Sequence, residues 1–328
     1  MRQASLRLAI VLGIVAGAPI AARAAPSPTS EVVVADYKLP VVDKTAVTAN
    51  GLVADLYAPR LRGRLPAIIV LGGSEGGMGA GAARDARLIA QHGFVTLQVA
   101  YFDAPGLPKE LGLIPLEYFK TAIDWLRAQP NVDPNRIGIE GTSIGGEAVL
   151  VIASHYPQIK AVVAAVPSSV VWPGISYVVQ QPPSTWTLAG KPLPDLPYGW
   201  SGSFKGVYDL YAEGLKGLDK HPEAVIPVEF INGPVMVICG KDDKLWPSCP
   251  MSEQVVARLK AKGFRHPVMF LAYGDAGHAV FGPPVPADSP HFSDLGSLGG
   301  TPQGNETARE DNWLRAMDFM DEALKPHR

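Results

Sequence analysis

The sequence predicts an α/β fold in which a mostly parallel sheet carries helices on both faces. Short apolar and β-branched runs alternate with helical patterns along most of the chain. One of these runs passes through Gly141-Thr142-Ser143-Ile144-Gly145 directly into a helical pattern. The chain has 328 residues, of which 47% are hydrophobic and 18% charged, so it can build a large core and is not a disordered chain.

The predicted strands are short runs bounded by turn residues. They are Ala67–Leu71, Phe94–Ala100, Arg136–Glu140, Ile159–Val166, Val235–Cys239 and Val268–Tyr273. Helical patterns lie between or after them at Ala82–Gln91, Leu116–Ala128, the residues that follow Ser143, Met251–Lys262 and Thr307–Leu324. Strands that are joined by helical crossovers run parallel, whereas the alternation over Val47–Tyr57 predicts an antiparallel pair at the sheet edge.

The first 24 residues differ in character from the rest. Arg2 and Arg7 precede an uncharged apolar run from Leu8 to Ala22, and Ala22-Arg23-Ala24 has the form of a signal-peptidase site. The run is shorter than the roughly 20 residues of a membrane span. We therefore expect a cleaved secretory signal, a mature protein without a membrane span, and a periplasmic or secreted location.

Residues 25–328 are expected to form a single domain that contains one long insertion, at 167–234. The insertion is rich in Pro, Gly and aromatic residues, and it follows a predicted parallel strand at the sheet edge where such folds bind ligands. This position predicts a lid or substrate-binding insertion. Its aromatic residues are Trp172, Tyr177, Trp186, Tyr198, Trp200, Phe204, Tyr208 and Tyr211. We expect Trp172, Tyr177, Trp186 and Trp200 to line an apolar acyl pocket, the alternative being that they anchor the insertion to the body.

Ser143 is the predicted nucleophile. It lies at a tight turn between a strand and a helix, and Gly141 and Gly145 supply the small residues that such a strained turn requires. This strand-turn-helix context is typical of a nucleophile elbow, which exposes a serine hydroxyl at the end of a sheet. An ordinary glycine-rich connection is the alternative.

A serine hydroxyl needs a base, and His278 is the best candidate for it. The histidine follows the last predicted strand in Asp275-Ala276-Gly277-His278, at the same sheet edge as Ser143 and in the chain order serine, acid, histidine. His291 is the second candidate.

The orienting carboxylate is expected in Gly240-Lys241-Asp242-Asp243, which follows another predicted strand. Two adjacent side chains cannot both face the imidazole. We choose Asp243, because loops of this form usually carry the acid three residues after the glycine. Asp242 is then expected to cap the loop or the following helix.

Backbone N–H groups of Ile144 and Ser74 are the predicted oxyanion donors. Ile144 follows the nucleophile, and Ser74 lies in the glycine-rich loop 72–77 after an early strand. That loop lacks the glycine patterns of nucleotide-binding sites, and no metal-ligand spacing occurs. With 29 basic and 31 acidic residues, the chain has no electrostatic footprint for nucleic acid.

The chain has two cysteines, Cys239 and Cys249, on either side of the acid loop. A disulfide is possible in an exported protein, but spacing does not establish geometry. The favoured interpretation is two separate thiols, one on a core strand and one at a helix start. Nothing in the sequence predicts the oligomeric state.

Several linked motifs resemble one known family. They are Leu116-Glu117-Tyr118-Phe119, Trp125-Leu126, Gly141-Thr142-Ser143-Ile144-Gly145, Ile226-Pro227-Val228-Glu229, Gly233-Pro234, the segment 240–248, Ala276-Gly277-His278 and Gly299-Gly300-Thr301-Pro302. In this order they resemble the catalytic domain of the acyl-CoA thioesterase and bile acid-CoA:amino acid N-acyltransferase family, from about Pro66 to the end. The resemblance implies an α/β-hydrolase fold, no cofactor, and a triad of Ser143, Asp243 and His278.

The function expected from these features is a serine hydrolase of acyl thioesters or esters. The transferase branch of the family uses cysteine as nucleophile, so the serine in this chain favours hydrolysis over transfer to an amine. Two alternatives remain from the sequence: an exported esterase or serine peptidase of the same fold, and a catalytically inactive binding protein.

Overall fold

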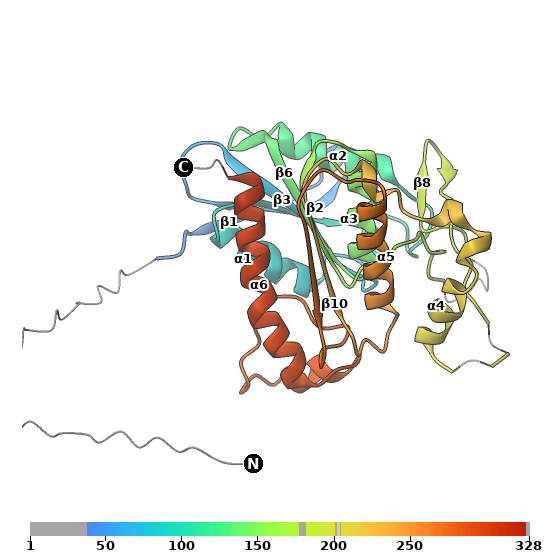
Figure 1. Ribbon diagram of the computed structural model, residues 1–328. Coiled ribbons are helices and arrows are strands. Elements are labelled where there is room, and N and C mark those ends of the chain that lie inside the picture. Colours follow the sequence, from blue (N-terminus) through green and yellow to red (C-terminus); the bar gives the residue numbers. More distant parts are fainter. Residues whose placement is uncertain (1–37, 177–181, 201, 204, 326–328) are drawn as a thin grey trace, which may run out of the picture. The chain divides into compact units, whose positions relative to one another are not determined.

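The core of the computed structural model is a mostly parallel sheet; the structure describes residues 38–176, 182–200, 202–203 and 205–325 (Figure 1). In that part of the chain the sheet has eight strands, in the order β1-β2-β4-β3-β6-β7-β10-β11. Their bounds are Val42–Val47 (β1), Val53–Pro59 (β2), Leu65–Leu71 (β3), Val95–Ala100 (β4), Val132–Thr142 (β6), Ile159–Ala165 (β7), Val235–Gly240 (β10) and Val268–Tyr273 (β11). The predicted signal peptide lies outside the described residues.

From β4 to β11 all neighbouring strands are parallel, and β1 and β2 add an antiparallel edge. The predicted fold class is therefore confirmed, although the edge pair begins at Val42 and not at Val47. Because parallel strands end at one edge of a sheet, the loops after β3, β6, β10 and β11 meet there. These loops carry Ser74, Ser143, Asp243 and His278 in turn.

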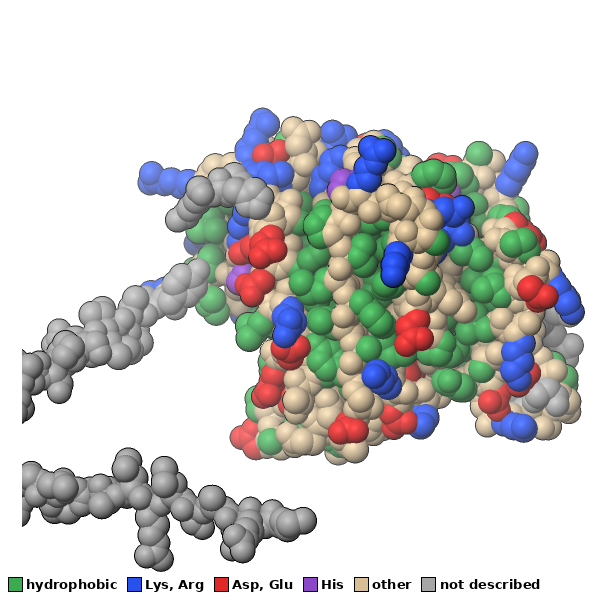
Figure 2. Space-filling model, in the orientation of Figure 1, with side chains coloured by type: hydrophobic (Ala, Val, Ile, Leu, Met, Phe, Trp, Pro, Cys, Tyr) green, Lys and Arg blue, Asp and Glu red, His purple; other side chains and the backbone are tan. Residues whose placement is uncertain are grey.

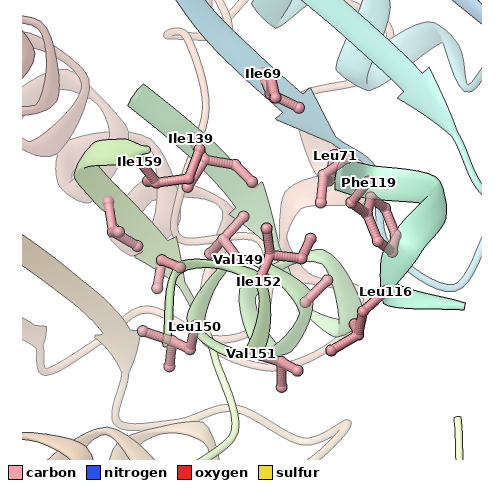
Figure 3. Packing of buried hydrophobic residues seen from close by; sticks show 14 of the residues in the cluster. Ile69, Leu71, Leu116, Phe119, Ile139, Val149, Leu150, Val151, Ile152 and Ile159 are labelled. Carbon is pink, nitrogen blue, oxygen red and sulfur yellow. The ribbon is translucent and has the colours of Figure 1, made fainter. Parts of the chain in front are cut away.

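Helices cover both faces of the sheet (Figure 1). Their bounds are Ala80–Gln91 (α1), Leu116–Arg127 (α2), Ile144–His155 (α3), Val207–Leu215 (α4), Ser248–Ala261 (α5) and Pro302–Leu324 (α6). In β3 the alternation of side chains divides the core: Ile69 and Leu71 pack with α2, α3 and α5, whereas Ile68 and Val70 pack with α1 and α6. Figure 3 shows the first of these packings, with Val149 and Ile152 of α3 against Ile69, Leu71 and Phe119.

The far edge of the sheet, formed by β11, is open in this chain. Among the described residues β11 pairs only with β10, and its residues 269–273 are partly exposed. Figure 2 shows hydrophobic side chains gathered between α6 and α5, where these two strands run. No helix of the described residues is long and apolar enough to cross a membrane.

The insertion 167–234 contains more regular structure than its proline content suggests. It holds α4, the short strands Trp186–Leu188 (β8) and Lys191–Pro192 (β9), and several single 3-10 turns. Strand β8 pairs with Ile114–Pro115 (β5) at the start of α2, which attaches the insertion to the body. Helix α4 contains no proline, whereas Pro192 lies at the end of β9 and Pro222 begins a 3-10 turn.

Glu147 of α3 provides a second attachment for the insertion. Its carboxyl group is fully buried, and Oε1 accepts hydrogen bonds from Trp186 Nε1 at 2.8 Å and from the Trp172 N–H at 3.3 Å. Oε2 has no hydrogen-bond partner in the described part of the chain. Burial raises the pKa of Glu147 from 4.5 to about 8, against the lowering effect of the two donors.

The last helix begins earlier than the predicted Thr307. Thr301 is its N-cap, with a side chain that accepts a hydrogen bond from the Gly304 N–H at 2.9 Å, and Pro302 is the first helical residue. The start of the helix carries the polar residues Asn305 and Glu306, which accept hydrogen bonds from the N–H groups of Gly277 and Val285. The apolar periodicity therefore begins only later in the helix.

Glu147→Gln is predicted to flatten the dependence of thermal stability on pH. The folded protein keeps a proton on Glu147 that the unfolded chain releases above pH 4.5, so the free energy of unfolding falls as the pH rises from 4.5 toward 8. A glutamine keeps an acceptor for Trp186 without the proton. Melting temperatures of both proteins from pH 5 to 9 check this, and equal slopes would contradict it.

Candidate active site

Ser143 occupies the turn between β6 and α3 in a strained conformation. Its φ of 63° and ψ of −124° lie in a region that residues with a side chain rarely adopt. Two backbone hydrogen bonds hold it there: the Ser143 N–H donates to the Ala165 carbonyl at 2.9 Å, and its carbonyl accepts from the Glu147 N–H at 3.0 Å. The turn has the geometry of a nucleophile elbow.

Glycines make this turn possible because other backbone segments press against it. A Cβ at Gly145 would lie 2.5 Å from the Gly72 carbonyl oxygen, and a Cβ at Gly146 would lie 2.6 Å from that of Ala165. A Cβ at Gly141 would meet the Gly145 carbonyl at a still shorter distance. The glycines therefore let β3, β6, β7 and α3 converge on Ser143.

A chain of hydrogen bonds joins the three predicted triad residues. His278 Nε2 lies 3.0 Å from Ser143 Oγ, and His278 Nδ1 lies 2.8 Å from Asp243 Oδ2. All three side chains are buried. In the tautomer that this geometry suits, Nδ1–H donates to the carboxylate and Nε2 accepts from the serine hydroxyl.

Asp243 is held by four donors. Oδ1 accepts from the N–H groups of Leu245 and Trp246 at 2.9 and 3.2 Å, and Oδ2 accepts from Ser248 Oγ at 2.6 Å as well as from His278. These four donors fix the direction of the Asp243 carboxylate toward the imidazole.

Asp242 points away from the imidazole, as expected from the choice of Asp243. Its Oδ2 accepts a hydrogen bond from the Gly300 N–H at 3.0 Å, and the carboxylate pairs with Lys244. The Lys244 ammonium and the Gly300 N–H lower the pKa of Asp242. Asp242 therefore ties the acid loop to the segment before α6.

One face of α6 holds the loop that carries His278. Asn305 Oδ1 accepts from the Gly277 N–H at 2.9 Å, Arg309 donates to the carbonyls of residues 279, 281 and 283, and Asn312 Nδ2 donates to the Val280 carbonyl at 2.8 Å. The three side chains are four and three residues apart, so they form one polar stripe. They are buried, so the loop has little freedom.

His291, the second candidate for the base, interacts with Asp294 and not with Ser143. Its side chain is 80% exposed and its Nδ1 lies 3.1 Å from Asp294 Oδ2, within a surface turn. The structure brings His278, and not His291, to the serine.

The predicted oxyanion donors lie beside Ser143. Ile144 is the first residue of α3, so its N–H has no acceptor within the helix, and both Ile144 and Ser74 line the cavity at Ser143. Tyr101 Oη donates to the Gly72 carbonyl at 2.7 Å and fixes the glycine-rich loop. A Cβ at Gly73 would lie 3.2 Å from Ser143 Cβ, which shows how closely this loop passes the serine.

Cys239 and Cys249 form a disulfide, so the prediction of two separate thiols is wrong. The two residues lie at the end of β10 and the start of α5, with Cα atoms 5.1 Å apart. The chain turns sharply between them to deliver Asp243, and that turn, which the spacing does not reveal, brings the sulfur atoms together. The bridge closes the base of the acid loop.

An apolar cavity of about 410 Å³ opens at Ser143. The insertion supplies much of its wall through Ile175, Tyr198, Val207, Leu210 and Tyr211, and Leu245 and Trp246 complete it. Trp246 also packs edge-on against the His278 ring, with centroids 6.1 Å apart. The cavity volume is within the range of small-molecule sites.

The tryptophans expected to line this cavity do not line it. Trp172 and Trp186 are fully buried. The Trp172 indole packs against Tyr198 and the Trp186 indole against Phe119, and these contacts anchor the insertion. Trp200 is 64% exposed and lies outside the cavity wall. Tyr177 lies outside the described residues. Tyr198 and Tyr211, from the wider aromatic set, line the cavity instead.

A second cavity, of about 420 Å³, meets Ser143 from the other face of the sheet. His278 lines this cavity together with polar and charged residues: Ser74, Glu75, Arg84, Asp85, Glu140, Thr142 and Arg309. Ser143 thus lies between an apolar cavity and a polar one.

Ser248, Trp246 and the α6 stripe were not identified from the sequence as parts of the site. Ser248 and Trp246 lie within the loop motif quoted above, and their proximity to Asp243 was the available signal. Asn305 gave none, because a single asparagine in a helix reveals no partner. Among the residues that the structure describes, no group of three or more His, Cys, Asp or Glu side chains is arranged to hold a metal ion.

The sheet order, the elbow and the Ser-His-Asp arrangement define a serine hydrolase of the α/β-hydrolase fold. The chain belongs to the BAAT / acyl-CoA thioester hydrolase C-terminal family, whose family model matches residues 114–326. The match includes Ser143, Asp243 and His278.

The names of similar curated proteins are consistent with membership of this family. Mouse peroxisomal succinyl-coenzyme A thioesterase is 28% identical over 292 residues, which cover 88% of this chain and 67% of the relative. Mouse acyl-coenzyme A thioesterase 6 is 31% identical over 300 residues with the same coverage. Mouse bile acid-CoA:amino acid N-acyltransferase is 28% identical over 294 residues, again with 88% and 67% coverage.

Solved structures share the fold at low sequence identity. Acylaminoacyl peptidase from Pyrococcus horikoshii aligns with a TM-score of 0.56 and 17% identity, covering 88% of this chain and 42% of the peptidase. A dienelactone hydrolase-like promiscuous phosphotriesterase from metagenomic libraries aligns with a TM-score of 0.54 and 16% identity, covering 88% of this chain and all of that one (100%).

Gly145→Ala is predicted to destabilise the protein by about 1–3 kcal/mol, because the new methyl group overlaps the Gly72 carbonyl and neither backbone can move freely. Gly81→Ala in α1 is the matched control: a Cβ there meets nothing within 4 Å, and alanine favours a helix by up to about 1 kcal/mol. Urea unfolding of both variants measures the difference. Equal stability would show that the elbow tolerates a side chain.

Proposed function

We propose that this protein hydrolyses acyl thioesters and esters through an acyl-enzyme formed on Ser143. The observation that carries the proposal is the hydrogen-bonded chain Ser143–His278–Asp243 at a strained turn that opens into an apolar cavity. The membership of the family and the thioesterase relatives support the same reaction class.

In the first half-reaction Ser143 Oγ attacks the acyl carbonyl carbon and His278 Nε2 takes the hydroxyl proton. Asp243 stabilises the imidazolium that results, and its other three donors keep the carboxylate in place. The N–H groups of Ile144 and Ser74 stabilise the oxyanion. The tetrahedral intermediate then collapses: the bond to the leaving group breaks, and His278 returns the proton to a leaving atom that needs it.

In the second half-reaction water attacks the acyl-enzyme and His278 again serves as the base. A second tetrahedral intermediate releases the carboxylic acid and restores the Ser143 hydroxyl. A thiolate leaves readily without protonation, so thioesters react if they fit the cavity.

The apolar cavity is proposed to hold the acyl chain. Its wall of Ile175, Val207, Leu210 and aromatic rings offers burial without charge, and each buried methylene is worth about 0.8 kcal/mol. The insertion therefore sets the acyl preference through residues of α4, and not through Trp172 or Trp186.

Ser143→Ala is predicted to abolish covalent labelling by a fluorophosphonate probe and to reduce kcat/KM roughly 10⁴-fold or more, since loss of the nucleophile leaves only binding and oxyanion effects. Intact-protein mass after labelling and initial rates with a hexanoyl thioester measure both. An adduct on the variant would refute the assignment of Ser143. A catalytically inactive protein would show no label even in the wild type.

Two histidine variants provide the control for the base. His278→Ala is expected to match Ser143→Ala in its loss of turnover, whereas His291→Ala leaves turnover unchanged because its side chain is exposed and pairs only with Asp294 among the described residues. The reverse ranking would move the base to His291.

A ladder of straight-chain acyl thioesters and esters is predicted to show kcat/KM rising about fourfold per methylene until the cavity is full. Leu210→Trp fills part of the cavity and is expected to move the optimum to shorter chains. Leu314→Trp is the matched control, because Leu314 is 65% exposed on α6. A flat ladder would remove the acyl-pocket assignment, and activity on peptides alone would identify a peptidase.

We further propose that the chain is exported and loses residues 1–24, because the N-terminal sequence has the form of a secretory signal. The disulfide supports this, since such bridges persist in oxidising compartments. Intact mass of protein from the periplasm or medium is predicted to correspond to a chain that begins at Ala25. Material that retains Met1 would contradict export by this route.

A further inference from the structure

We propose that the polar cavity binds the leaving group of the substrate, and that Glu140 makes the enzyme prefer leaving groups that both donate and accept hydrogen bonds. This inference rests on the proposed function, because it assumes an acyl-enzyme on Ser143. The inference gives a binding role to the polar cavity, which has no role in the two half-reactions described above.

The position of His278 indicates on which side of Ser143 the leaving group departs. Ser143 lines both cavities, but His278 lines only the polar one. The imidazolium formed on attack protonates a leaving alkoxide and attracts a leaving thiolate by its charge, so either leaving atom departs on the side of Ser143 where His278 lies. The acyl chain then extends to the other side, into the apolar cavity.

Glu140 and Asp85 both line this cavity, and among the described residues each has a buried carboxyl oxygen without a hydrogen-bond partner. Glu140 is the one that precedes Ser143 on its own strand. It lies three residues before Ser143 on β6, beside Val70 of β3 in the sheet register. Glu140 is only 3% exposed, and it lines the cavity. Its Oε2 has no hydrogen-bond partner among the described residues. An unsatisfied buried oxygen costs free energy until a ligand supplies a partner.

The two arginines of this cavity have interactions of their own. Arg309 of α6 donates to three loop carbonyls, and Arg84 Nε of α1 lies 3.6 Å from Asp85 Oδ1. Glu75 belongs to the loop after β3 and His278 to the catalytic chain. Burial and the nearby Asp85 raise the pKa of Glu140 well above its ordinary value. A carboxyl group that is buried with an unpartnered oxygen favours its neutral form.

A neutral carboxyl group has one donor and an acceptor side by side, which matches an amide or a hydroxyl group. With Glu140 uncharged, two arginines face two carboxylates, Glu75 and Asp85. The cavity therefore favours no charge of either sign. The leaving group it fits is an uncharged thiol or alcohol that carries an amide or hydroxyl group near the scissile bond.

The test compares hexanoyl thioesters that differ only in the leaving thiol: N-acetylcysteamine, butanethiol, thiocholine and 3-mercaptopropionate. All four give the same hexanoyl-enzyme, so differences in kcat/KM report acylation and the leaving group alone. The wild type is expected to prefer the N-acetylcysteamine ester to the butanethiol ester by about tenfold, the effect of one or two hydrogen bonds. The cationic and anionic thiols are expected to be poorer than N-acetylcysteamine.

Glu140→Leu is expected to remove this preference while deacylation, measured as the decay of the hexanoyl-enzyme, stays unchanged. Glu140→Gln keeps a donor and an acceptor, so it is expected to retain most of the preference for the N-acetylcysteamine ester. This variant keeps the proposal testable if Glu140→Leu does not fold. Glu147→Gln is the control for a change at a buried carboxyl group: Glu147 lines neither cavity, so any effect of this variant is expected to be equal for all four esters.

A uniform loss of kcat/KM across all four esters in Glu140→Leu would overturn the inference and assign Glu140 a structural role. A wild-type preference for butanethiol would overturn it as well, and a preference for either charged thiol would show that the cavity is not neutral. Failure of the proposed function would look different, because the wild type would then form no hexanoyl-enzyme with any ester.

Discussion

The left-handed backbone of Ser143 is the constraint on which the rest of the structure depends. A serine held at φ 63° is costly unless the surroundings leave no alternative. Here the surroundings are backbone atoms: the end of β3 lies against Gly145 and the end of β7 against Gly146. The register of the parallel strands therefore also fixes the positions of the catalytic groups relative to one another. A shift of one strand would remove the contacts that hold the serine in position.

The same turn separates two chemical environments. Side chains alternate along β6, so Glu140 and Thr142 face the α1 and α6 side, while Ile139 packs on the side of α2 and α3. Beyond the turn, α3 carries Glu147 toward the insertion and thereby supports the wall of the apolar cavity. A substrate with an apolar acyl part and a polar leaving part can thus lie across Ser143 with each part in a matching environment.

The sequence predicts five of the parallel strands closely, because β3, β4, β7, β10 and β11 are apolar runs whose ends agree with the structure to within two residues. The residues of the hydrogen-bonded chain were identifiable since each follows a predicted strand, namely β6, β10 or β11. Contacts between distant segments were not. Nothing in the spacing of Trp172 and Trp186 reveals that Glu147 accepts hydrogen bonds from the Trp186 indole and from the Trp172 backbone N–H, or that both side chains are buried. The disulfide and the polar start of α6 were missed for the same reason: each depends on a partner far away or on a turn geometry that periodicity does not encode.

The polar stripe of α6 links the most C-terminal helix to the reacting groups. Asn305, Arg309 and Asn312 hold the loop after β11, while Met317, Met320 and Leu324 of the same helix pack against the sheet. Elements of a protein open locally with different free energies, and a helix at one side of a sheet can detach before the sheet itself melts. Detachment of α6 would release His278 from its place beside Ser143 although the elbow stayed intact. Heat inactivation by this route would depend on one helix–loop contact, and amide exchange in α6 would report on it more directly than exchange in the central strands.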